Sequence, residues 1–263
     1  MSKRTNLMTG LLMLALLLGL SMQTASADEA LDKAFAALNT YEWGQDRALL
    51  SAIDAAVVAS HDDAAAQKAL SAKLAAVLPS SAPQAAKDYA CRQLSLIAAA
   101  DSVPAIAGLL GDEKLSHMAR YALERISAPE AIAAIRDALP TVKGKVKVGV
   151  INSLGVRRDA ESTAALTALL DDSDEGIAGA AAAALGKIGS ADAAKALGAF
   201  QAKAPEGLKL AAADAYLACA EQLLADGKKI DALMIYKSLI KPDQPKHVRL
   251  AATRGMLAAT GKK

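Results

Sequence analysis

The side chains best suited to chemistry are few and scattered along this sequence. The three histidines, His61, His117 and His247, stand in separate segments and form no HxxxH, HExxH or CxxCH pattern, so they indicate neither a zinc pair nor a haem attachment site. No glycine-rich phosphate loop follows a strand-like run, and no serine has the GxSxG context of a nucleophile elbow. The sequence therefore predicts no catalytic residues, no metal site and no cofactor.

Pairs of acidic residues recur where helical runs begin. Asp62-Asp63, Asp112-Glu113 and Asp171-Asp172 each precede a segment with helical periodicity. A carboxylate at such a place accepts hydrogen bonds from the free N–H groups of the first helical turn and suits the helix dipole. We therefore expect these acids to cap helices, and we do not expect paired-carboxylate catalysis.

One polar cluster stands out against an alanine-rich background. It falls on and just after three consecutive helical segments and consists of Arg92, His117, Arg120, Asn152, Arg157 and Arg158. If these segments line one wall, the cluster offers several donors to an acidic or carboxylate-bearing partner. Replacing Arg92, Arg120 and Arg157 together by alanine should then abolish binding without loss of helix. The alternative is a set of solvated helix faces and ion pairs, such as Arg120 with Glu124 at i+4.

A repeat predicts the elements that position this cluster. Apolar anchor residues are spaced by 29, 31, 31, 31 and 40 positions, and the residues four before them are all alanine or valine. Such offsets place side chains on one helical stripe, and a small middle residue lets a neighbouring helix approach. The anchors are Leu94, Leu123, Leu154, Leu185, Tyr216 and Met256, and the residues four before them are Ala90, Ala119, Val150, Ala181, Ala212 and Ala252.

Another amphipathic segment precedes each anchor helix from the second onward. These segments are Val103–Leu110, Ala131–Leu139, Thr163–Leu170, Ala191–Phe200 and Ile230–Ile240. A single helix pair cannot bury its apolar face, so the pairs must stack. The predicted fold class is all-α, an α-solenoid of stacked antiparallel helix pairs. We expect the longer last spacing to lengthen the helix that ends near Ala225.

Two segments before the regular array, Asp28–Leu38 and Asp46–Leu78, have helical periodicity but fall outside the register, as terminal capping elements often do. Trp43, the only tryptophan, lies in the connector between them. We expect its indole to plug the apolar end of the stack, because large aromatic rings dominate packing at such places. The alternative is an exposed ring that stacks on a ligand.

Three segments carry a resemblance to a known repeat family. Asp171–Gly189 reads DDSDEGIAGAAAAALGKIG and resembles a HEAT repeat of the phycobilin-lyase type, and Leu115–Ile126 and Val146–Gly155 are similar to it. This resemblance implies a HEAT-like, armadillo-like superhelix and, through the lyases, a tetrapyrrole as a conceivable ligand. Residues 219–239, with a glycine turn between two helical runs, resemble a tetratricopeptide unit.

The N-terminal segment predicts export. Lys3 and Arg4 precede an apolar run over Leu7–Met22, and the small triplet Ala25-Ser26-Ala27 follows. This order is that of a secretory signal peptide, here residues 1–27 with cleavage near Ala27. An uncleaved anchor is disfavoured because the run falls short of the roughly 20 residues that span a bilayer. The expected location is periplasmic or extracellular, and together with the repeats the chain resembles exported bacterial HEAT-repeat proteins.

Two cysteines, Cys91 and Cys219, are predicted to be carried into that oxidising space. They stand four repeat units apart. Because neighbouring helices lie about 8–10 Å apart, we expect the two residues to be too distant for a disulfide bond. Both cysteines are therefore predicted to be free and buried.

Charge and composition narrow the function classes. Without Lys3 and Arg4, 28 basic residues balance 28 acidic ones, which disfavours nucleic-acid binding.

The predicted domains are the signal peptide at 1–27, a helical cap at 28–81, HEAT-like repeats at 82–219 and a tetratricopeptide-like or HEAT-like unit at 220–263. The predicted function is a non-enzymatic scaffold that binds another protein or peptide, with no membrane span after cleavage. The alternatives are a tetrapyrrole-binding or lyase-like protein and a subunit whose chemistry lies on another chain.

Overall fold

The computed structural model describes residues 27–261, and within that range every regular element is a helix. All of the predicted signal peptide except its last residue lies outside the described residues. The chain divides into two compact units, one that ends at Ala98 and one that begins at Ala99. No helix of the described part is long and apolar enough to cross a membrane.

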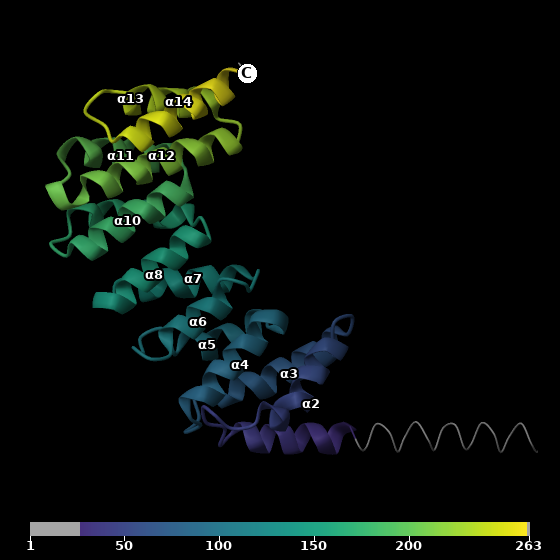
Figure 1. Ribbon diagram of the computed structural model, residues 1–263. Coiled ribbons are helices and arrows are strands. Elements are labelled where there is room, and N and C mark those ends of the chain that lie inside the picture. The colour runs from purple at the N-terminus through teal and green to yellow at the C-terminus, as the bar shows by residue number, and fades with distance from the viewer. Residues whose placement is uncertain (1–26, 262–263) are drawn as a thin grey trace, which may run out of the picture. The chain divides into compact units, whose positions relative to one another are not determined.

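The described part of the first unit consists of helices and their connectors (Figure 1). They are a helix at 27–38, the 3₁₀ helix η1 (Arg47–Leu50), α2 (Ser51–Ala59), α3 (Ala64–Val77) and α4 (Gln84–Ile97). Leu38, Leu50, Ile53 and Leu74 are fully buried in its core. Asp63 divides α2 from α3 and caps α3, since its Oδ1 accepts hydrogen bonds from the N–H groups of Ala65 and Ala66.

The prediction that Trp43 plugs the end of the stack is wrong. Its side chain is 61% exposed, while Leu38 and Leu50 are completely buried on either side of the connector in sequence. The connector itself is a set of local turns. Gly44 there has φ +89°, and the Gln45 side chain accepts a hydrogen bond from the Glu42 N–H at 3.1 Å. These turns keep the indole on the surface. The large size of the ring was therefore not sufficient to bury it.

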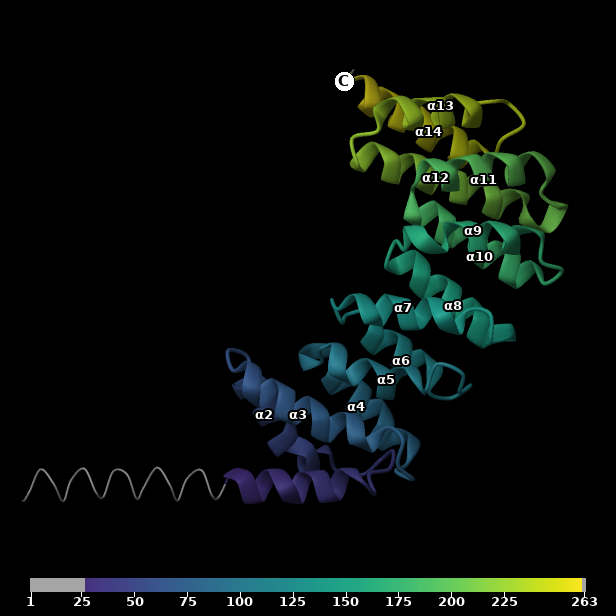
Figure 2. The ribbon, with the colours of Figure 1, turned by 180° about the vertical axis from the view of Figure 1, so that it is seen from behind.

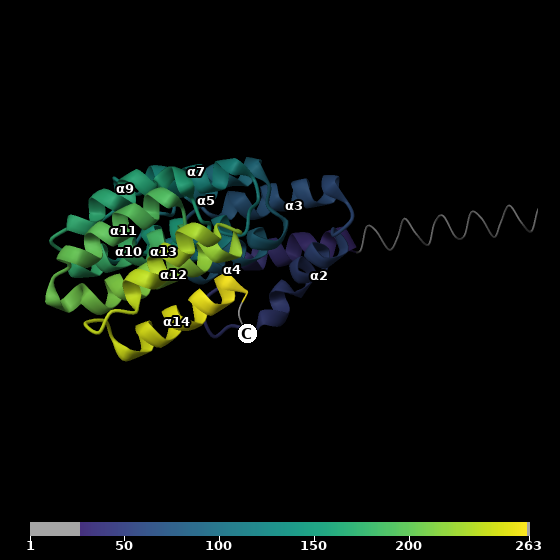
Figure 3. The same cartoon turned by 90° about the horizontal axis from the view of Figure 1, so that it is seen from above.

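The second unit is a stack of five helix pairs, as the repeat predicted (Figures 1 and 2). The first helices of the pairs form the first-helix row: α5 (Val103–Ala107), α7 (Pro129–Ala138), α9 (Thr163–Ala168), α11 (Ala191–Lys203) and α13 (Lys229–Leu239). The second helices form the second-helix row: α6 (Ser116–Leu123), α8 (Gly144–Val156), α10 (Glu175–Ile188), α12 (Lys209–Ala225) and α14 (Lys246–Thr260). Seen from above, α7 and α9 lie along one edge of this unit and α14 along the opposite edge (Figure 3).

The predicted stripe faces the core in every repeat. All six residues four before the anchors are completely buried. Leu94, Leu123, Leu154 and Leu185 are completely buried as well, whereas Tyr216 and Met256 are half-buried. The register read from the sequence is therefore confirmed, and it weakens only in the last two layers.

The last spacing of the anchors lengthens because α12 is long. This helix continues for nine residues beyond Tyr216 to Ala225, whereas α10 continues for three beyond Leu185. Gly227, with φ +78°, then turns the chain into α13. The expected extension of this helix is thus confirmed.

Consecutive helices of the second-helix row touch through glycine. A Cβ atom on Gly155 of α8 would lie 2.8 Å from the Cα of Ala184 in α10. One repeat later, a Cβ atom on Gly186 of α10 would lie 2.6 Å from the carbonyl oxygen of Ala215 in α12. Real Cβ atoms essentially never approach so closely, so these glycines let three helices pack backbone to backbone.

The two cysteines are free and buried, as predicted. Burial raises the pKa of the Cys91 thiol to about 12 and that of Cys219 to about 11. Both thiols are therefore protonated and unreactive in the folded protein at neutral pH.

Candidate interaction surface

The outward face of the second-helix row is built from side chains that recur with the repeat. Residues at offsets −6, −2 and +2 from each anchor point away from the buried stripe, and all of them are exposed or half-buried. We call this surface the outer wall. Its columns are His117, Val148, Gly179, Leu210 and Leu250; Tyr121, Asn152, Ala183, Asp214 and Arg254; and Arg125, Val156, Lys187, Ala218 and Ala258.

The character of the outer wall changes along the row. Polar side chains such as His117 and Asn152 are exposed on α6 and α8, whereas α10 presents two small residues and Lys187. Large apolar side chains are also exposed, with Val156 at 53%, Leu210 at 49% and Leu250 at 57%. Leu210 and Leu250 occupy the same column on successive helices of the row, and contiguous exposed apolar groups are typical of a site that contacts another molecule.

The structure separates the predicted polar cluster into three groups. His117 and Asn152 are exposed on the outer wall of the second unit. Arg92 is also exposed, but it lies on α4 in the first unit. Arg120, Arg157 and Arg158 instead form hydrogen bonds to neighbouring repeats.

Arg120 turns into the contact between α6 and α8. Its guanidinium donates hydrogen bonds to the Gly149 carbonyl at 3.1 Å and to the Ser153 hydroxyl at 3.2 Å. Gly149 makes room for it, because a Cβ atom there would lie 2.6 Å from the guanidinium carbon. Ser153 donates in turn to Glu124 at 2.6 Å, so this serine joins Arg120 and Glu124 across two helices. Burial lowers the pKa of Arg120, and the charge of Glu124 opposes this effect.

Arg157 caps the end of α6 from the next repeat. It donates hydrogen bonds to the carbonyls of Ile126 at 2.6 Å and Glu124 at 3.1 Å, which the helix itself leaves free. Arg158, at φ +51°, pairs with the Asp226 carboxylate beyond α12. Replacing Arg120 and Arg157 by alanine would therefore remove bonds between repeats, so those variants cannot separate binding from folding.

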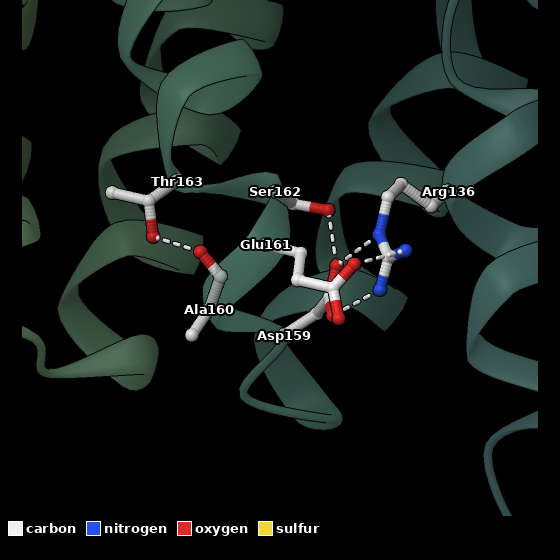
Figure 4. A network of polar contacts seen from close by, with 6 residues as sticks. All are labelled: Arg136, Asp159, Ala160, Glu161, Ser162 and Thr163. Carbon is white, nitrogen blue, oxygen red and sulfur yellow. Dashed lines mark hydrogen bonds and ion pairs between the residues drawn. The ribbon is translucent and has the colours of Figure 1, made fainter. Parts of the chain in front are cut away.

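The most buried ion pair of the second unit was not predicted from the sequence (Figure 4). Arg136 of α7 donates two hydrogen bonds to Asp159, at 2.9 and 2.7 Å, and contacts Glu161 at 2.7 Å. Ser162 donates to the same aspartate, whose side chain is only 7% exposed. Burial favours the neutral acid, but the hydrogen bonds from Arg136 and Ser162 outweigh it and hold the pKa of Asp159 below its ordinary value.

This ion pair connects α7 to the turn that precedes α9. Arg136 and Asp159 stand 23 residues apart and belong to no local pattern, so nothing in the sequence marks them as partners. A bidentate arginine fixes the geometry of both elements as well as their charge. The pair therefore positions successive layers and presents no free group for chemistry.

The prediction that paired acids cap helices is confirmed at Asp63, whereas Asp112 and Asp172 accept hydrogen bonds from residues that precede α6 and α10. Asp112 accepts hydrogen bonds from the N–H groups of Lys114 and Leu115, and Asp172 accepts one from Asp174. Asp174 itself caps α10. Among the described residues, no three His, Cys, Asp or Glu side chains gather closely enough to hold a metal ion.

Comparison with known families identifies the repeat. Residues 142–216 match the family model described as HEAT repeats. The match begins just before α8 and ends in α12, within the segment 82–219 for which HEAT-like repeats were predicted. This part of the chain is therefore similar to HEAT repeats.

Among solved structures, the chain is similar to two engineered proteins. One crystal structure shares 19% identity and a TM-score of 0.43, with 89% of this chain and 69% of the other covered. A second shares 19% identity and a TM-score of 0.40, with 80% and 96% covered. No curated protein matches the chain.

Proposed function

We propose that this protein is an exported, non-enzymatic scaffold that binds another protein or peptide through the outer wall. Solenoids of stacked repeats offer long surfaces of this kind, and their chemistry is that of recognition. The basic, apolar and small-residue segments of residues 1–27 support export. A partner that docks here would meet five consecutive helices whose side chains recur at the spacing of the repeat.

The observation that carries this proposal is the exposure of large apolar side chains on the outer wall. Val156 projects from α8 and Leu210 from α12, and each is about half exposed. Leu250 occupies the same column as Leu210 on the next helix of the row. Covering such groups stabilises a complex by about 25 cal/mol per Å² of apolar surface. Ile230 and Met234 of α13 are exposed as well, so the experiment must distinguish the two faces.

Affinity capture with matched variants tests the proposal. The Val156→Glu/Leu210→Glu variant places two charges on the outer wall. The Ile230→Glu/Met234→Glu variant does the same on α13 of the first-helix row, where the native side chains are 75% and 61% exposed. All three proteins are immobilised, incubated with the periplasmic and secreted fractions of the source organism, and compared by mass spectrometry.

We expect the native chain and the α13 variant to retain one partner in stoichiometric amount, and the outer-wall variant to lose it. Circular dichroism should show equal helix content in all three. Retention by the outer-wall variant, or loss by the α13 variant, would contradict the proposal. A coloured small-molecule passenger without a protein partner would favour the ligand-binding alternative, and a chain that still carries residues 1–27 in those fractions would contradict cleavage.

A further inference from the structure

A cleft of about 460 Å³ opens where the second-helix row ends. It lies between α12 and α14 and reaches down to α13. Binding sites for small molecules commonly measure about 300–1,000 Å³, and one water molecule takes only about 30 Å³. The residues that carry the argument are Glu221 and Leu224 of α12, Tyr236 of α13, and Ala251, Arg254 and Gly255 of α14.

The cleft exists because the glycine contact of the earlier layers is not repeated. Gly186 follows its anchor by one residue, and the corresponding position of α12 is Leu217. On the facing helix, the counterpart of Ala215 is Gly255, and the atoms nearest to a Cβ placed there belong to the Tyr236 ring. The α14 backbone therefore packs on an aromatic ring of α13, and this leaves a cleft beside α12.

Tyr236 belongs to the lining of this cleft. The side chain is 1% exposed, and its oxygen has no hydrogen-bond partner among the described residues. Buried hydroxyl groups are almost always paired, so this oxygen indicates a polar group that the folded chain does not itself supply. Burial raises the pKa of Tyr236 and the charge of Glu221 raises it further, so the hydroxyl stays a hydrogen-bond donor at neutral pH.

Two opposite charges line the same cleft. Glu221 and Arg254 are both exposed, and neither forms an ion pair with a described residue. Small and apolar residues such as Leu224 and Ala251 complete the walls. A carboxylate and a guanidinium in the lining of one cleft complement a ligand that carries an ammonium group, a carboxylate and an apolar body.

We propose that this cleft binds a zwitterionic α-amino acid or short peptide with apolar side chains. Arg254 pairs with the ligand carboxylate and Glu221 with its ammonium group. The Tyr236 hydroxyl donates a hydrogen bond to an oxygen of the ligand. The site shares Arg254 with the outer wall, but titration of the isolated chain tests it without a protein partner, so its failure and that of the proposed scaffold function are distinguishable.

Isothermal titration of the chain with four related compounds tests this site. L-leucine and L-leucyl-L-leucine carry both charges, N-acetyl-L-leucine lacks the ammonium group, and L-leucinamide lacks the carboxylate. We expect at least one zwitterion to bind, and each singly charged analogue to bind at least tenfold more weakly, since a charged hydrogen bond is lost. A preference for the dipeptide identifies a peptide site, and a preference for leucine identifies an amino-acid site.

Variants locate the ligand. Arg254→Gln should weaken zwitterion binding at least tenfold and leave the affinity for leucinamide unchanged. Glu221→Gln should also weaken zwitterion binding at least tenfold, and it should leave the affinity for N-acetyl-leucine unchanged. Tyr236→Phe should weaken binding while the melting temperature does not fall. Lys187→Gln, which removes a charge from the outer wall on α10, is the matched control and should bind normally. The proposal is overturned if no zwitterion binds at millimolar concentration, or if Arg254→Gln and Glu221→Gln bind like the native chain.

Discussion

Two glycines of the same helix, seven residues apart, are predicted to respond differently to alanine. A Cβ atom on Gly179 of α10 would meet only the end of the Leu208 side chain, at 3.4 Å. A Cβ atom on Gly186 would lie 2.6 Å from the Ala215 carbonyl oxygen and 3.3 Å from its Cα. The first position has room for a methyl group, whereas the second would push α10 and α12 apart.

The magnitudes follow from this geometry. Replacing glycine by alanine inside a helix stabilises it by about 0.8–1 kcal/mol, so Gly179→Ala should raise the free energy of unfolding by about that amount. Gly186→Ala gains the same helix propensity, but overpacking a tight contact costs about 1–3 kcal/mol. The helix propensity is the same in both variants and cancels, so their free energies of unfolding should differ by about 1–3 kcal/mol.

Urea denaturation followed by circular dichroism measures this difference from the shift in midpoint at a common slope. We expect Gly179→Ala to unfold at a higher urea concentration than the native chain, and Gly186→Ala to unfold at a lower concentration than Gly179→Ala. Equal midpoints for the two alanine variants would refute the claim that helices of the second-helix row touch backbone to backbone.

Two further predictions concern the ion pair at Asp159 and the indole at Trp43. Because the native pKa of Asp159 lies below its ordinary value of about 3.9, its carboxylate stabilises the fold above that pH, and the contribution is lost as the pH falls through the lowered pKa. Urea titrations should thus show the native chain more stable than Asp159→Asn at pH 7, with a gap that narrows below about pH 4; a gap that does not change with pH would contradict the pairing. Trp43, 61% exposed and the only tryptophan, should emit at the wavelength of a solvated indole, and Trp43→Ala should change the free energy of unfolding by less than about 0.5 kcal/mol. A blue-shifted emission that acrylamide does not quench would instead show that the indole is buried, and it would contradict the exposed position of Trp43.

The layered architecture was predictable because it depends on a local rule. An apolar stripe with a small residue at its centre buries one face of each helix, and residues such as Ala119 and Ala181 are completely buried where the repeat placed them. The longer last spacing of the anchors likewise predicted the extension of α12, which ends at Ala225. Periodicity thus determines which face is buried and how many layers stack.

The polar contacts were less predictable because their partners lie one repeat away. The sequence indicated Glu124, at i+4, as the nearest partner for Arg120. The guanidinium instead donates a hydrogen bond to the carbonyl of Gly149, 29 residues later. Only the absence of a side chain at Gly149 makes that bond possible, and a single sequence gives no reason to connect the two positions. The prediction that Trp43 is buried failed for a different reason. Its size predicted burial, but the turns of its connector place the side chain on the surface.

Hydrogen exchange of the chain with its captured partner tests the central claim most directly, because it reports which helices the partner covers. If the outer wall is the contact surface, binding should slow amide exchange in α8, α10 and α12 and leave α9, α11 and α13 unchanged. Protection confined to the first-helix row, or unchanged exchange throughout the second unit when the partner is bound, would contradict the account.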